Sequence, residues 1–213
     1  MYQTASLAVD PQKGFTPVCP LELPVPEGDE IAAHLNFMAS FAQLHTASKD
    51  WHCEKGLWVA NEQHPQLSPL GIKDADVYWN RHCIGGTEGA EFIDGLPPVE
   101  DFDFIAYKGM EPQLHPYSAC YHDLAGTKST GLIEWYRQNH VENVVVGGLA
   151  YEFCVKETVL HLVNAGFNVL LYAPAVRGIY PELIKKAAEE MVSKGAVIVE
   201  TAEQLQVLLS KDR

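Results

Sequence analysis

The chain has 213 residues, 47% of them hydrophobic, and a formal net charge of −13, so we expect one globular domain over residues 1–213. The acidic charge argues against a nucleic-acid partner, because sequence-independent binding needs a basic surface. No apolar run has the length of a transmembrane helix and residues 1–10 lack a signal-peptide pattern, so we expect a soluble, cytoplasmic protein without a membrane partner.

Hydrophobic runs and periodicity predict strands and helices that largely alternate along the chain. Strands are predicted at residues 5–9, 44–48, 102–107, 143–147, 168–172 and 196–199. Helices are predicted at residues 31–42, 132–138, 155–165 and 181–194, and a last helix opens at Thr201, which with Gln204 resembles a capping box. This order predicts an α/β fold, a three-layer doubly wound sandwich with a mostly parallel sheet. Residues 50–101 lack periodicity, and we expect this irregular segment to be functional because structureless loops of that length are uncommon.

Four chemically active positions follow predicted strands. Asp10, Asp50 and Lys108 each come just after a predicted strand, and Cys154 lies where a strand leads into a helix, a place that favours a thiolate. The carboxyl ends of parallel strands share one edge of a sheet, so these side chains should converge there. Taken singly, Cys154 could be a packed core residue, Asp10 a turn cap and Lys108 a solvated lysine. Together they form the set that thiol-based amide hydrolysis needs, with Lys108 lowering the pKa of the thiol.

A second group of residues suits a metal ion. Asp50 and His52 are two residues apart at a strand end, so their side chains point to the same side, and His82 follows in the irregular segment. One carboxylate and two imidazoles can bind zinc, iron or manganese. His64 and Glu62 are candidates for an additional ligand. Loop histidines also occur as purely structural residues, and spacing does not separate the two readings.

Six motifs, in this order, resemble those of the nicotinamidases within the isochorismatase-like hydrolase family. They are VDPQKGF (9–15), SKDWH (48–52), WNRHCIGGTEGAEF (79–92), YKG (107–109), PYSA (116–119) and GGLAYEFCVKETV (147–159). The resemblance implies the isochorismatase-like hydrolase fold with a six-stranded parallel sheet. It also implies hydrolysis of nicotinamide to nicotinate and ammonia, a step of NAD salvage. The Asp-Trp-His and Trp-x-x-His-Cys elements place it with the branch that carries one divalent metal ion, with zinc as the first expectation. Assembly is common in that family, so a homo-oligomer is allowed.

The resemblance also implies roles for individual residues. Cys154 would attack the amide and form a thioester acyl-enzyme, Asp10 would transfer the proton, and Lys108 would hold the carboxylate of Asp10. A cis peptide bond between Leu149 and Ala150 would direct the N–H groups of Ala150 and Cys154 into an oxyanion hole. The resemblance implies that the metal ligands are Asp50, His52 and His82. It implies that the aromatic walls around the substrate ring are Phe15, Trp79, Tyr117 and Phe153.

The chain departs from the family pattern at several positions. Tyr151-Glu152 stands where Thr-Asp is usual, and His115-Pro116 replaces Asp-Ser. Cys53 follows the Asp-Trp-His motif and Gly56 stands where another histidine is usual, which leaves a fourth metal ligand open. Two alternatives therefore accompany nicotinamide hydrolysis: a related enzyme for a different small amide, and a non-catalytic binding module. A dinucleotide-binding domain is excluded because GGLAYE lacks the Gly-x-Gly-x-x-Gly pattern.

Overall fold

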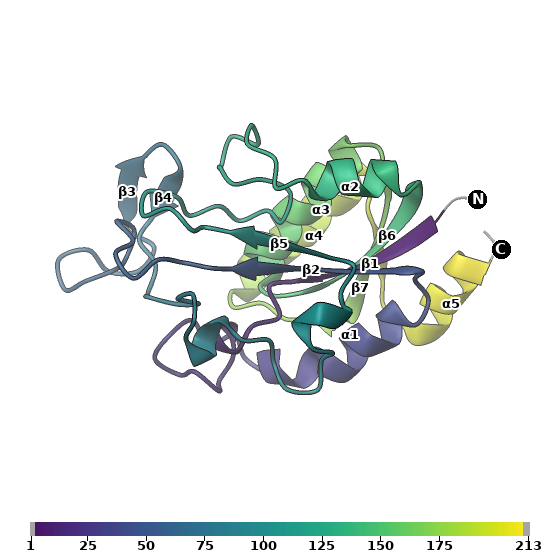
Figure 1. Ribbon diagram of the computed structural model, residues 1–213, viewed down its shortest axis with the longest axis horizontal. Helices are drawn as coiled ribbons and strands as arrows, with labels where there is room; N and C mark the ends of the chain where they lie inside the picture. The colour runs from purple at the N-terminus through teal and green to yellow at the C-terminus, as the bar shows by residue number, and fades with distance from the viewer. Residues whose placement is uncertain (1–2, 211–213) are drawn as a thin grey trace.

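A sheet of six parallel strands forms the centre of the protein (Figure 1). The computed structural model describes residues 3–210. In the spatial order β5-β2-β1-β6-β7-β8, the strands are Phe104–Lys108, Leu44–Asp50, Gln3–Val9, Val141–Gly148, Asn168–Val176 and Val197–Val199. The run Val144, Val145 and Val146 in β6 is fully buried, as expected for a strand covered on both faces. The predicted parallel sheet is confirmed, with each strand within a few residues of its expected position.

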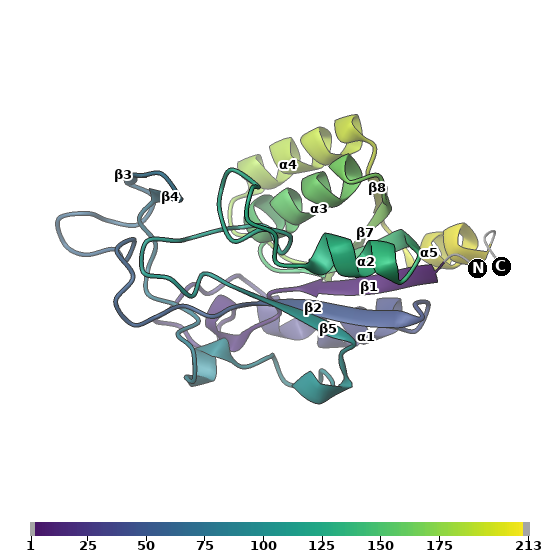
Figure 2. The same ribbon diagram turned by 45° about the horizontal axis from the view of Figure 1, so that its top comes forward.

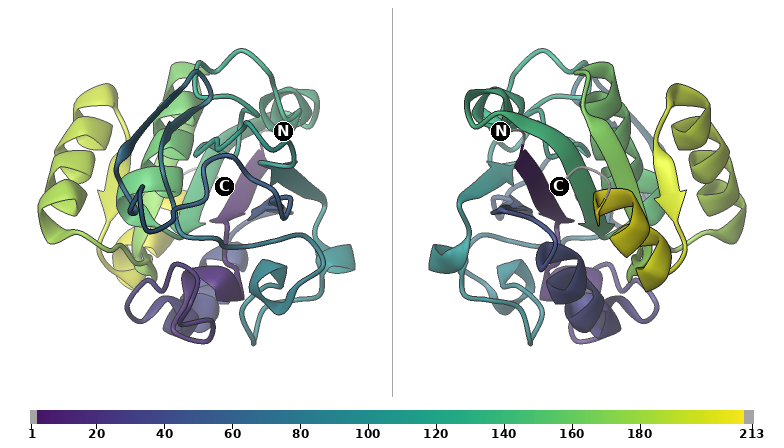
Figure 3. Two further views of the ribbon diagram at one scale, coloured as in Figure 1. Left: turned by 90° about the vertical axis from the view of Figure 1, so that its left-hand side faces the viewer. Right: turned by 90° about the vertical axis from the view of Figure 1, so that its right-hand side faces the viewer.

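Helices cover both faces of the sheet (Figures 2 and 3). On one face lie α1 (Ala32–Ala39) and α5 (Ala202–Ser210), and on the other α2 (Leu132–Gln138), α3 (Lys156–Asn164) and α4 (Pro181–Lys194). Leu35 of α1 packs in one core cluster and Leu162 of α3 in the other. The predicted three-layer α/β sandwich is therefore confirmed. Among the described residues, no helix is both long and apolar enough to cross a membrane.

Two helix ends illustrate what the local sequence decides. The N–H of Gln204 donates to Oγ1 of Thr201 at 3.3 Å, so Thr201 caps α5 as expected. Oε1 of Gln204 accepts the N–H of Glu200 at 2.9 Å, one residue before the N–H that a capping box uses. By contrast, α1 ends at Ala39, three residues earlier than its hydrophobic pattern predicts. There the N–H of Ser40 donates to the carbonyls of both Asn36 and Phe37, which tightens the last turn.

The irregular segment lies beyond the carboxyl ends of the strands. It contains one short antiparallel hairpin, β3 (Pro69–Ile72) and β4 (Ala75–Val77), which the sequence did not predict. Figure 1 shows this hairpin at one end of the molecule, whereas β1 begins and α5 ends at the opposite end. Strands of four and three residues are too short to give a periodic signal.

The chain reverses its direction of winding between β1 and β6. From β1 it builds outward through β2 to β5, and it then crosses back to β6 on the other side of β1. Ligands of doubly wound sheets bind at such a switch point, outside the carboxyl ends of the strands. Gly148 has a φ of +132°, and a Cβ there would lie 2.0 Å from the carbonyl oxygen of Val9. Only glycine therefore lets the end of β6 lie this close to the end of β1, where Asp10 follows.

Candidate active site

Cys154 lies between β6 and α3, at the switch point of the sheet. The peptide bond between Leu149 and Ala150 is cis, and Tyr151–Val155 form one π-helical turn that continues into α3. The carbonyl oxygen of Cys154 accepts a hydrogen bond from Oγ1 of Thr158 at 2.7 Å. The thiol is buried and faces the carboxyl ends of β1, β2 and β5 rather than the solvent. Its surroundings therefore come from residues that are distant in sequence.

Two carboxylates and one ammonium group surround this thiol. Nζ of Lys108 lies 3.0 Å from Oδ2 of Asp10, hydrogen-bonds to Oδ1 of Asp50, and lies 3.8 Å from the sulfur of Cys154. One carboxylate oxygen of Asp10 and one of Asp50 lie within 4.8 Å of that sulfur and of one another. Ser48 donates a 2.7 Å hydrogen bond to Oδ1 of Asp10 and so holds the carboxylate in place. The structure thus brings together the acid, the cation and the thiol that the sequence predicted to converge.

The pKa values of the two acids in this cluster shift in opposite directions. Burial opposes the charge on Lys108, but the carboxylates of Asp10 and Asp50 outweigh it and raise the pKa of Lys108 well above its usual value. Burial also acts against the charge on Asp50, yet the ammonium of Lys108 holds the pKa of Asp50 well below its usual range. For Asp10, burial prevails over the attraction of Lys108, and its pKa is raised. Asp10 is therefore the stronger base of the two.

The thiol carries its proton in this arrangement. Burial raises the pKa of Cys154 well above its usual value, and the negative charges of Asp10 and Asp50 act in the same direction, against the attraction of Lys108. The sequence predicted the opposite direction, because the position near a helix start and Lys108 were both expected to favour a thiolate. A lone cation would lower the thiol pKa, but here the same cation is shared with two carboxylates.

Three imidazoles meet next to Asp50. The ring nitrogens of His52, His82 and His115 lie within 4.8 Å of one another, and all three side chains are buried. Nε2 of His52 lies 3.3 Å from Oδ2 of Asp50, and Nε2 of His82 lies 3.7 Å from the same oxygen. Asp50 therefore joins the two clusters, with one oxygen on Lys108 and the other facing the histidines.

The donor atoms of this cluster suit a divalent cation. Nδ1 of His52 lies 2.9 Å from the carbonyl oxygen of Gly109, and Nδ1 of His82 lies 2.6 Å from that of Asn80. A carbonyl oxygen only accepts, so each Nδ1 carries the hydrogen and each Nε2 presents a lone pair. Among the described residues, Oδ2 of Asp50 and Nε2 of His52 have no hydrogen-bond partner although both are buried. Buried acceptors that converge without a donor are satisfied by a metal ion.

The candidates for an additional ligand lie elsewhere. His64 is exposed and stacks on Tyr78 at 4.8 Å between ring centroids, and Glu62 is also exposed. The structure does not bring either residue to the cluster of His52 and His82, where His115 lies instead. The sequence marked His115 only as a departure from the family pattern. One signal could have found it: it follows β5 by seven residues and so falls at the same edge of the sheet.

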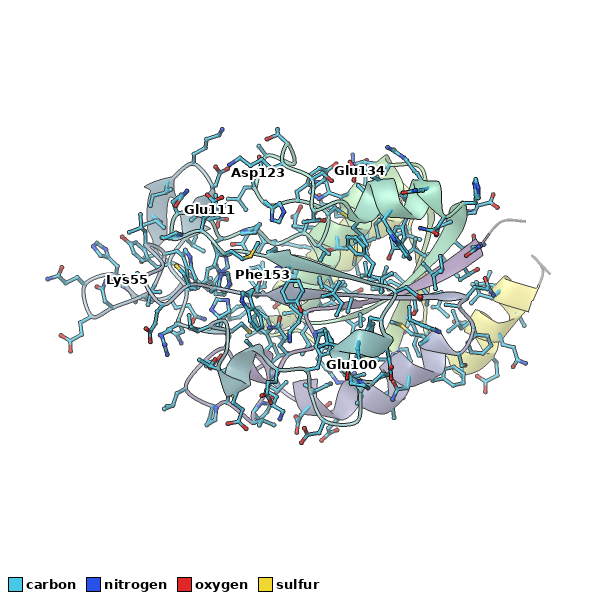
Figure 4. The ribbon with its side chains drawn as sticks, in the orientation of Figure 1. Lys55, Glu100, Glu111, Asp123, Glu134 and Phe153 are labelled. Carbon is cyan, nitrogen blue, oxygen red and sulfur yellow. The ribbon has the colours of Figure 1, made fainter. Side chains whose placement is uncertain are left out.

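A narrow pocket opens between these two clusters. Among its lining residues are all four aromatic side chains that were predicted to wall the substrate, Phe15, Trp79, Tyr117 and Phe153. Phe153 meets Trp79 edge to face, with 4.9 Å between the ring centroids. In Figure 4, Phe153 is drawn over the sheet, whereas Lys55 belongs to the irregular segment at the left of the view. Tyr117 accepts a hydrogen bond from Nε1 of Trp79 at 3.2 Å. The lining also includes the polar or reactive side chains of Cys154, Asp50, His82 and His115, together with Ala150.

Residues 4–203 match the isochorismatase domain family. The chain belongs to this family. A nicotinamidase of Escherichia coli (strain K12) is 30% identical to it over 189 residues, which cover 85% of this chain and 88% of that relative. The solved structure of an Acinetobacter baumanii nicotinamidase/pyrazinamidase has a TM-score of 0.85 at 29% identity and covers 92% of this chain and 95% of its own. A pyrazinamidase of Pyrococcus horikoshii, solved in complex with zinc, has a TM-score of 0.73 at 36% identity. The match covers 93% of this chain and 99% of the pyrazinamidase chain.

In this isochorismatase-domain protein, Tyr151 and Glu152 lie outside the pocket lining. Oε1 of Glu152 accepts the N–H groups of Ile179 and Tyr180 at 2.9 and 2.7 Å. The buried carboxylate thus ties the π-helical turn to the loop before α4, and Ile179 of that loop does line the pocket. The departure from the usual Thr-Asp therefore changes how the pocket is supported more than what faces the substrate.

Replacing Glu152 by alanine should destabilise the fold. The substitution leaves the partly buried N–H groups of Ile179 and Tyr180 without their acceptor, which costs at most about 1–3 kcal/mol for each group. Glu152→Gln keeps an oxygen at Oε1 and serves as the matched control. Thermal unfolding followed by circular dichroism should show a drop of several degrees for Glu152→Ala and a much smaller one for Glu152→Gln. Equal midpoints for both variants would mean that this contact does not hold the loop.

Proposed function

We propose that this protein is a metal-dependent cysteine amidohydrolase that converts nicotinamide and water to nicotinate and ammonia, a step of NAD salvage. The nicotinamidase of Escherichia coli, 30% identical over most of both chains, supports this activity. The observation that carries the proposal is that Cys154 lines an aromatic pocket and lies beside Lys108, which pairs with Asp10. The pocket walls suit a flat ring, and the buried thiol suits attack on an amide attached to it.

In the proposed reaction, the sulfur of Cys154 attacks the amide carbon while its proton passes to Asp10. The raised pKa of Cys154 means that this proton leaves as the bond forms, and the raised pKa of Asp10 suits a residue that accepts it. The N–H groups of Ala150 and Cys154 are proposed to bind the negative oxygen of the tetrahedral intermediate. Asp10 then gives the proton to the departing nitrogen, which leaves as ammonia, and a nicotinoyl thioester remains on Cys154.

A water molecule completes the turnover. Asp10, again a carboxylate, takes a proton from the water as its oxygen attacks the thioester carbon. The carbon–sulfur bond breaks, nicotinate is released, and the proton returns to the sulfur of Cys154. Lys108 is proposed to keep the carboxylate of Asp10 oriented and to balance its charge throughout, since its ammonium is paired with both acids.

Asp50, His52 and His82 are the proposed metal ligands, and zinc is the proposed metal. The zinc complex of the Pyrococcus horikoshii pyrazinamidase, 36% identical to this chain, supports zinc over iron or manganese. When bound, the metal would supply a positive charge beside Asp50 and near the ring nitrogen of the substrate. Phe15, Trp79, Tyr117 and Phe153 are proposed to enclose that ring.

Ammonia release from purified protein tests the function. We expect hydrolysis of nicotinamide, little hydrolysis of benzamide, which has the same shape but no ring nitrogen, and less still of aliphatic amides. Prolonged chelation should lower the activity, and zinc should restore it. Preference for an aliphatic amide would favour the alternative of a different substrate, and no hydrolysis of any amide would favour a binding module. Full activity in a preparation shown by elemental analysis to be metal-free would contradict the metal role.

Three expectations from the sequence remain predictions. They are the organisation of residues 1–213 as one catalytic domain, a cytoplasmic location, and assembly into a homo-oligomer.

A further inference from the structure

We propose that His115 is a fourth protein ligand of the metal ion, so that the site consists of one carboxylate and three imidazoles. The inference rests on the proposed metal role of Asp50, His52 and His82. None of the motifs that point to the family includes His115, and the sequence placed the additional ligand at His64 or Glu62.

The distances between donor atoms agree with one shared ion. Nε2 of His115 lies 3.4 Å from Nε2 of His82, and Nε2 of His52 lies 3.3 Å from Oδ2 of Asp50. Ligands bonded to zinc at about 2.1 Å in a tetrahedral site lie about 3.4 Å from one another. An N–H···N hydrogen bond is usually shorter than the separation between His115 and His82.

Hydrogen bonding within the cluster does not satisfy its acceptors. The lone pairs on Nε2 of His52 and His82 and the charge on Oδ2 of Asp50 all face the same space. His115 could donate one hydrogen, to His82, and the acceptors on His52 and Asp50 would still lack a donor. One cation bound to all four residues satisfies each of these acceptors, and among the described residues only Nδ1 of His115 is then left in the cluster without a hydrogen-bond partner.

The surrounding structure fixes the ring of His115 in this direction. The ring stacks against His52 at 5.1 Å with an interplanar angle of 12°, and Trp58 meets it edge to face at 4.6 Å. The N–H of His115 donates to the carbonyl oxygen of Asp74 at 2.8 Å, which ties this loop to the β3-β4 turn. Gly56 makes the arrangement possible, because a Cβ at this position would lie 2.7 Å from the indole ring of Trp58.

A site with three imidazoles has two consequences. Nitrogen-rich sites favour zinc and other late first-row metals over magnesium or calcium, which prefer oxygen ligands. His115 also lines the substrate pocket and stacks on Trp79 at 5.7 Å, so it would place the metal against the aromatic wall. Two departures from the family pattern are then linked: Gly56 leaves room for the ring of Trp58, and Trp58 packs against His115.

Zinc affinity tests the inference, with His115→Phe as the variant. Phenylalanine keeps an aromatic ring between His52 and Trp79 but has no donor atom. The matched control is His64→Phe, which changes the exposed histidine of the irregular segment. In competition with a chromophoric chelator, we expect His115→Phe to bind zinc at least about 10–100-fold more weakly and His64→Phe to bind as the unaltered protein does. The visible absorption of the cobalt-substituted protein should also change in His115→Phe only.

The outcomes separate this inference from the proposed metal site. If the unaltered protein binds zinc and His115→Phe binds it equally well with an unchanged cobalt spectrum, His115 is not a ligand and the three-residue site stands. If the unaltered protein binds no zinc, both fail. X-ray absorption by the unaltered zinc protein decides the matter even if His115→Phe does not fold. Three imidazoles in the first coordination sphere support the inference, and two overturn it.

Discussion

Replacing Cys154 by alanine should abolish amide hydrolysis and leave the fold intact. The sulfur is the atom proposed to bond to the substrate carbon, and loss of a nucleophile that acts with its base lowers kcat by at least about 10⁴-fold. The side chain is small and buried, and alanine keeps its Cβ, so little packing is lost. Initial rates of ammonia release, with circular dichroism to check folding, measure the effect.

Cys120→Ala is the control for this experiment. Cys120 is also buried and belongs to the same core cluster as Cys154, but it lies outside the pocket lining. We expect near-normal activity for Cys120→Ala. Substantial hydrolysis by Cys154→Ala would contradict the proposed thioester, whereas equal loss in both variants would point to damage of the core instead.

Replacing Lys108 by methionine should cost both stability and activity. The ammonium group is fully buried and pairs with Asp10 and Asp50, so its removal leaves two carboxylates together without a counter-charge. Breaking a buried ion pair by removing one partner typically costs about 3–5 kcal/mol. Urea unfolding should show this loss, and the addition of Asp10→Asn to Lys108→Met should recover part of the stability while activity stays lost.

Lys49 offers a matched control for Lys108. It is also a buried lysine near the end of β2, but its ammonium lies over the ring of Phe92 at 4.5 Å instead of between two carboxylates. Burial lowers the pKa of Lys49, the opposite direction to Lys108. Lys49→Met should therefore cost much less stability, about 1–2 kcal/mol at most for a lost cation–π contact. Comparable losses for Lys49→Met and Lys108→Met would show that the paired carboxylates are not what makes Lys108 essential.

The parts of this protein that follow from periodicity could be predicted from its sequence. Strands and helices were found by their hydrophobic patterns, and the convergence of Asp10 and Lys108 followed from the common edge of parallel strands. His115 follows β5 by seven residues, which indicates the edge of the sheet where it lies but not the direction of its side chain, because residues 109–131 contain no helix or strand. The pKa of Cys154 was predicted in the wrong direction for a related reason. The sequence reveals a nearby lysine, but not that the thiol is buried or that two carboxylates share the charge of that lysine.

Trapping the acyl-enzyme tests the central claim most directly. Protein that is turning over nicotinamide would be quenched with acid, digested, and examined by mass spectrometry for the peptide that contains Cys154. The account predicts a mass increase of one nicotinoyl group on that cysteine, absent from Cys120, together with nicotinohydroxamate when hydroxylamine is present during turnover. Sustained turnover with an unmodified Cys154 peptide and no hydroxamate would contradict it.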